Sequence, residues 1–140
     1  MRQKKNKTIV LLMYSARQST HREKMEALVR ELGPGVRLCL FDSPIGFEGA
    51  VASSLYGQVI FLILLENEND QREIQGLRNI LDGHNIILIL PDTEDAVMIR
   101  GMSLYPRYMS YLKDDYRDVY DVLEKMITKI RNQRKGKDNG

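Results

Sequence analysis

Cysteine, glycine-rich motifs and long apolar runs are scarce in this chain of 140 residues, and each scarcity removes a class of protein. The one cysteine, Cys39, permits no internal disulfide and no cysteine-based metal site, which fits a reducing compartment. No apolar run approaches the ~20 residues of a membrane span, and the run from Thr8 to Met13 is short for a signal peptide. GxGxxG and Walker phosphate-binding patterns are missing. The sequence therefore predicts a cytoplasmic protein without a membrane segment.

Charge is distributed unevenly along the chain. The net charge is +2, yet residues 1–7 carry four Lys or Arg, and residues 131–140 carry four more with one Asp. The stretch from Thr8 to Ile130 consequently holds 13 basic and 18 acidic residues, a net of −5. Basic ends can contact nucleic acid or acidic partners, but we interpret these as disordered termini that aid solubility, and we expect no nucleic-acid partner. The length predicts one domain, residues 8–131, flanked by basic disordered termini, residues 1–7 and 132–140.

Buried strands are the clearest pattern in the sequence. The run QVIFLILL, residues 58–65, is apolar after Gln58 and lies between turn signals, which is typical of a strand covered on both faces. The run VRLCLF, residues 36–41, alternates more and indicates an edge strand. The remaining predicted strands are 8–13, 86–90 and 108–112.

Helical patterns separate these strands. Thr20 with Glu23, and Asp70 with Glu73, have the spacing of helix-starting capping residues. The predicted helices are 20–32, 47–55, 70–81, about 93–102 with irregular apolar positions, and 115–130. Five strands alternating with five helices predict an α/β fold. The expected form is a three-layer, flavodoxin-like doubly wound parallel sheet in the order 2-1-3-4-5.

In such folds a ligand binds at the carboxyl ends of the strands, near the switch between strands 1 and 3. The alternation, with YLK before the last helix, resembles the receiver domains of response regulators. That resemblance implies an aspartate acceptor after strand 3, a Mg²⁺-binding acid pair after strand 1, a Ser or Thr after strand 4 and a Lys after strand 5. The corresponding residues here are Ser15, Glu66, Thr93 and Lys113, so the acid pair and the aspartate are missing, and we expect neither a metal nor a cofactor.

A second resemblance extends from Thr8 to Ile130. The stretches ILILPD, PRYMSY and DDYRDV look like those of small, stand-alone, receiver-like bacterial proteins that lack the phosphoacceptor set. This implies a pseudo-receiver, a signalling module that acts through protein contacts and is not an enzyme. Receivers commonly pair through the fourth helix, the fifth strand and the fifth helix, so that face is expected to bind a protein partner or a second copy. The candidate residues there are Arg100, Tyr105, Arg107, Tyr108 and Tyr111.

Enzymatic alternatives stay open at this point. The loop after the first strand supplies hydroxyls but no glycine for a flavin phosphate, and the chain has no Trp. The stretch YGQVIFLILLENEND is similar to the third strand of TIR domains, in which NAD-cleaving members use a glutamate on the following helix. That residue would be Glu73 here. A TIR-like or another nucleotide-binding α/β enzyme is therefore the alternative hypothesis.

Overall fold

The computed structural model describes residues 8–16, 19–55 and 58–139. Its strands are β1 (Ile9–Tyr14), β2 (Val36–Phe41), β3 (Val59–Leu64), β4 (Asn85–Leu90) and β5 (Tyr108–Tyr111). Its helices are α1 (Thr20–Arg30), α2 (Pro44–Ala52), α3 (Glu68–Gln75), α4 (Arg78–Leu81), α5 (Asp95–Met102) and α6 (Arg117–Asn139). All strand pairs are parallel, in the order β2-β1-β3-β4-β5. The predicted fold class and strand order are confirmed.

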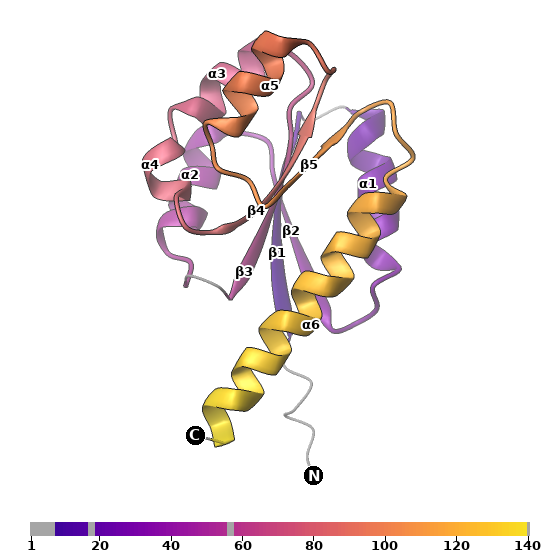
Figure 1. Ribbon diagram of the computed structural model, residues 1–140, viewed down its shortest axis with the longest axis vertical. Coiled ribbons are helices and arrows are strands. Elements are labelled where there is room, and N and C mark those ends of the chain that lie inside the picture. Colours follow the sequence, from indigo (N-terminus) through magenta and orange to yellow (C-terminus); the bar gives the residue numbers. More distant parts are fainter. Residues whose placement is uncertain (1–7, 17–18, 56–57, 140) are drawn as a thin grey trace.

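Alternation along the strands divides the core into two layers. On one face, Phe61, Ile63 and Leu88 pack under α2, α3, α4 and α5. On the other face, Leu62 and Ile87 pack under α1 and α6 (Figure 1). Because both faces of β3 are covered, all six of its side chains are buried, as its unbroken apolar run predicts.

The third predicted helix is two helices, separated at Gly76 and Leu77. Its start was also predicted wrongly. Asn67 is the cap, and its Oδ1 accepts the N–H of Asp70 at 2.9 Å, so α3 begins at Glu68. An Asn side chain with extended backbone satisfies a free N–H at a helix start, which makes it as good a cap as Asp.

The largest other differences from the predicted helix boundaries are at α2 and α6. Helix α2 begins at Pro44 after the cap Ser43, and Leu55, predicted to mark its buried face, is 71% exposed beyond its end. Helix α6 continues to Asn139, through the stretch 132–139 that was predicted to be a disordered tail. That stretch has no proline, and its cations are favourable at a helix C-terminus. The N-terminal arm, residues 1–7, lies outside the described residues.

Candidate functional site

The strand order brings the carboxyl ends of β1 and β3 together at the rim where a receiver would carry its acids. Strand β1 ends in Tyr14, which is 3% exposed and whose hydroxyl donates to Oε1 of Glu73 at 3.4 Å. Burial, followed by the charges of Glu73 and Asp70, raises the pKa of Tyr14 far above its ordinary value. The end of β1 therefore offers a neutral phenol in place of a carboxylate.

Ser15 follows Tyr14 and is closed off from solvent. It is 1% exposed, its N–H donates to the Phe41 carbonyl at 3.0 Å, and its hydroxyl donates to the Ala16 carbonyl at 3.3 Å. A hydroxyl that is buried and engaged with the backbone is poorly placed to contact an incoming anion. The first of the four acceptor-face candidates thus helps to hold the β1 end against β2.

Glu66 follows β3 and is half-buried. Its N–H donates to Oδ2 of Asp70 at 3.0 Å, and its own Oε2 is buried with no hydrogen-bond partner among the described residues. Burial, followed by the charges of Glu66 and Asp114, raises the pKa of Tyr116 to about 12. The acid after β3 therefore has one carboxylate oxygen withdrawn from solvent.

Thr93 and Lys113 lie in exposed loops after β4 and β5. Within the described parts of the chain, no hydrogen bond or ion pair joins any two of the four candidates. The structure gives Thr93 and Lys113 access to solvent while Ser15 and part of Glu66 are enclosed. The four candidates therefore share one rim without forming a single polar cluster.

A tyrosine outside the four rim candidates links the starts of two helices. Tyr116 is 2% exposed, and its hydroxyl lies 2.9 Å from Nδ1 of His21 and 3.3 Å from the Leu112 carbonyl. Its φ of +65° is in the left-handed region, which is costly for a bulky side chain. The ring joins the starts of α1 and α6, a link between distant segments that no local pattern could reveal.

The two acids at this rim, Asp70 and Glu73, bind neighbouring groups of the protein itself. Asp70 is a backbone acceptor at the start of α3, and Glu73 accepts the Tyr14 hydroxyl. Among the described residues, no group of three or more His, Cys, Asp or Glu side chains is arranged to hold a metal ion. Likewise, no helix in that part of the chain has both the length and the apolar character needed to cross a bilayer.

The second candidate region is the face formed by α5, β5 and α6, where the five partner candidates divide into two groups. Tyr105 is 73% exposed, and Arg107 is exposed at the start of β5. The Tyr108 hydroxyl donates to Oδ2 of Asp118 at 2.7 Å, and the Tyr111 hydroxyl lies 4.0 Å from Sδ of Met98. Tyr105 and Arg107 are thus directed to solvent, and both other tyrosines fasten β5 to its neighbouring helices.

Arg100, the fifth candidate, faces α3. Its Nε and Nη2 donate to Oε1 of Gln71 at 3.3 and 3.2 Å, and Glu68 lies 3.9 Å away. Gln71 is 2% exposed and donates to the Val97 carbonyl at 3.3 Å. Arg100 therefore links α5 to α3, and its side chain remains 37% exposed.

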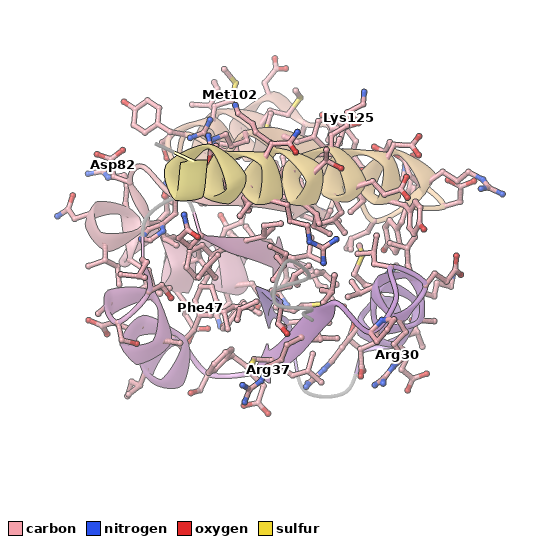
Figure 2. All side chains as sticks on the ribbon, turned by 90° about the horizontal axis from the view of Figure 1, so that it is seen from below. Arg30, Arg37, Phe47, Asp82, Met102 and Lys125 are labelled. Carbon is pink, nitrogen blue, oxygen red and sulfur yellow. The ribbon has the colours of Figure 1, made fainter. Side chains whose placement is uncertain are left out.

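Two apolar residues on this face were missed. Ile99 and Met102 are 67% and 56% exposed, and with Tyr105 they recur every three residues along one side of α5 and the turn that follows it. Figure 2 shows Met102 at the opposite margin of the molecule from Arg37. The irregular apolar pattern of this helix was the available signal, because α5 has apolar residues both toward the core, at Val97, and toward solvent.

Comparison with known proteins places this geometry in a fold family. No protein-family model and no curated protein sequence matches the chain. Among solved structures, the chain is similar to a protein described as a pilus assembly protein (CpaE) from Burkholderia thailandensis. The TM-score is 0.63 and the identity 14%, over 86% of this chain and 99% of that chain.

Two further structures extend the likeness. A pilus assembly-related protein from Burkholderia pseudomallei has a TM-score of 0.61 and 13% identity, over 84% of this chain and 89% of that one. A CheY-like response regulator receiver domain protein from Methanospirillum hungatei has a TM-score of 0.60 and 13% identity, over 88% and 98%. The chain has the fold of a CheY-like receiver domain.

Proposed function

We propose that the chain is a receiver-like signalling module that is not phosphorylated on an aspartate, is not an enzyme and acts through protein–protein contacts. The observation that supports this most directly is the end of β1, where Tyr14 and Ser15 stand in place of an acid pair. Phosphoryl transfer to a carboxylate depends on cations that neutralise the transferring group, and the acids that would hold Mg²⁺ are missing from this position.

The residue after β3 supports the same proposal. Glu66 has one buried carboxylate oxygen, and its N–H donates to Oδ2 of Asp70. An acceptor needs an oxygen that can reach solvent and a metal-bound phosphoryl group. We infer that Glu66 helps to position the rim and receives no phosphoryl group.

The phosphorylation test uses acetyl phosphate or beryllofluoride with Mg²⁺. We expect no mass increase with acetyl phosphate and no Mg²⁺-dependent change in the amide NMR signals of Glu66 and Lys113 with beryllofluoride. An active receiver domain treated identically controls for the reagents. Saturable, Mg²⁺-dependent shifts of both residues would contradict the proposal.

The contact surface proposed for the partner is the α5–β5–α6 face, and it is supported by the exposed side chains of Ile99, Met102 and Tyr105. Large apolar side chains grouped on a surface are typical of protein interaction sites. We expect Ile99→Lys to abolish capture of the partner by the intact chain. Ile45→Lys is the matched control, because Ile45 is 82% exposed on α2. Equal capture by both variants would exclude this face.

A further inference from the structure

Strand β2 is an edge strand with unusually little protection. It has six residues and pairs with β1 alone in the described sheet. Natural edge strands are commonly blocked by prolines, bulges or several charges, because their free N–H and C=O groups otherwise attract another strand. Here Arg37 is the one charged residue of the strand, and Figure 2 shows it at the outer margin of the molecule.

The hydrogen bonds to β1 show which backbone groups remain free. The Ile9 N–H donates to the Gly35 carbonyl at 2.9 Å, and the Ser15 N–H donates to the Phe41 carbonyl at 3.0 Å, so odd-numbered residues of β2 face β1. Because this direction alternates along a strand, Leu38 and Leu40 direct their N–H and C=O groups away from the sheet. Val36 shares their direction, but its N–H already donates to the Gly33 carbonyl at 3.3 Å.

The side chains beside this edge form an apolar groove. Val36, Leu38 and Leu40 point toward α1, and Leu40 is 37% exposed. A groove of about 410 Å³ lies between these residues and α1, with Val29 in its floor. The ion pair of Glu26 and Arg30, 3.0 Å long, also lines it. Strand β2 therefore has outward-facing backbone groups and an apolar groove along the same residues.

We propose that β2 pairs antiparallel with β2 of a second copy of this chain, about a two-fold axis through Cys39. Leu38 of each copy then lies opposite Leu40 of the other, and each pair exchanges two backbone hydrogen bonds. The leucine side chains enter the groove on the α1 side. An interface of this kind is self-complementary, as a two-fold symmetric dimer requires.

Two neighbouring registers are less favourable. An axis through Leu38 uses the Val36 N–H, which is already bonded within its own turn. An axis through Arg37 places two like charges directly opposite one another, which destabilises a strand pair. With the axis at Cys39, each Arg37 lies opposite Phe41 of the second copy, and the two arginines are far apart.

Charge on the neighbouring helix also favours a second copy as the occupant. The two-fold rotation reverses the direction of α1 in the second copy, so the Glu26–Arg30 pair of one copy runs opposite to that of the other. Glu26 of one copy is thereby directed toward Arg30 of the second copy. The groove margin is complementary to itself in charge as well as in shape.

The sole cysteine reports this register directly. In the proposed pair the two Cys39 residues form a non-hydrogen-bonded pair with Cα atoms about 4.5 Å apart, within the range of a disulfide. We expect the full-length chain to sediment as a dimer under reducing conditions and to form a covalent dimer rapidly on mild oxidation. Cys39→Ser is expected to remain a dimer and to form no covalent product. A dimer in which Cys39 does not cross-link would overturn the register.

Leu40→Lys tests the edge itself, and Ile99→Lys is its control on the other side of the molecule. Leu40 is partly exposed, so the substitution should leave the circular dichroism spectrum and thermal unfolding of the monomer intact. We expect it to raise the dimer dissociation constant about a hundredfold, since both Leu38–Leu40 contacts of the symmetric pair are lost. Ile99→Lys should leave the constant unchanged. A monomeric wild-type chain at millimolar concentration, or a dimer broken by Ile99→Lys and not by Leu40→Lys, would refute the proposal.

Discussion

The two edges of this sheet present different kinds of surface. At the β2 edge, the six-residue strand pairs with β1 alone among the described residues, and Arg37 is its one charged side chain. At the β5 edge, the strand has four residues, and its tyrosines bond to side chains of α5 and α6. One edge is thus defined by main-chain groups, and the other by the side chains of two helices.

This difference bears on which partner each edge can bind. Main-chain groups pair with any strand of suitable register, so the β2 edge suits a second copy that supplies the same strand. The side chains Ile99, Met102 and Tyr105 beside β5 suit a partner with a complementary pocket. If both proposals hold, the chain dimerises through the β2 edge and leaves the β5 side free for a different partner.

Gly101→Val should have the largest effect on stability, because it disturbs the packing of α5 beside the β5 edge. A Cβ at Gly101 would lie 3.1 Å from Cδ2 of Leu90 and 3.2 Å from Cδ2 of Leu88, so these side chains would have to shift to admit a valine. Overpacking of this kind costs about 3 kcal/mol of unfolding free energy. Urea denaturation measures the loss, and partner capture should fall with it while the Cys39 cross-link of the remaining folded protein persists.

Gly49→Ala is the matched control on α2. A Cβ there meets no atom within 4 Å, so the change should stabilise the chain by up to about 1 kcal/mol through helix propensity. An equal loss of stability in both glycine variants would show that close packing of α5 on β4 is not the cause.

Arg100→Ala should loosen α5 to a smaller extent. The substitution leaves Oε1 of the buried Gln71 without its donor, and an unsatisfied buried acceptor costs about 2 kcal/mol. Arg72→Ala is the control, because its ion pair with Glu68, 3.6 Å long, is exposed at both ends and contributes about 0.5 kcal/mol or less. If both variants lose the same stability in urea denaturation, the α3–α5 contact has no special role.

The fold could be predicted from the sequence because the composition of each strand indicates whether it is central or at an edge of the sheet. Continuous apolar runs marked β3 and β4 as central, and the alternation of β2 marked it as an edge. The limits of helices were harder to predict, since Asn67 and Asp70 are equally good capping residues and only the bond from the Asp70 N–H distinguishes them. The extension of α6 was missed because basic residues are compatible with both a helix and a tail.

The candidate site was less predictable than the fold. The position of Ser15, Glu66, Thr93 and Lys113 at the carboxyl rim follows from strand order alone, but their burial and bonding do not. The role of Arg100 at a partner surface stays a prediction, and its contact with Gln71, which is distant in sequence, was not predicted. Tyr116 joins His21 across the rim in the same way. Contacts between distant segments depend on side-chain directions that periodicity does not contain.

Tyr108→Phe should have the smallest effect, and that effect should depend on pH. The hydrogen bond to Asp118, with burial and nearby acids, raises the pKa of Tyr108 from 10.0 to about 12. The unfolded chain therefore loses this proton first, so the stabilisation is complete below pH 10 and is lost as the pH rises through 12. At neutral pH the variant should lose about 1 kcal/mol, as expected for one hydrogen bond.

The difference between wild type and Tyr108→Phe should therefore shrink as the pH rises from 10 to 12. Urea denaturation across this range measures it, and Tyr105→Phe is the control because Tyr105 is 73% exposed. The pKa of Tyr116 is also raised to about 12, so wild type and both variants share the loss of stability that this residue causes at high pH. A constant difference at every pH would mean that the hydrogen bond to Asp118 does not raise the pKa of Tyr108. In that case packing alone would join β5 to α6.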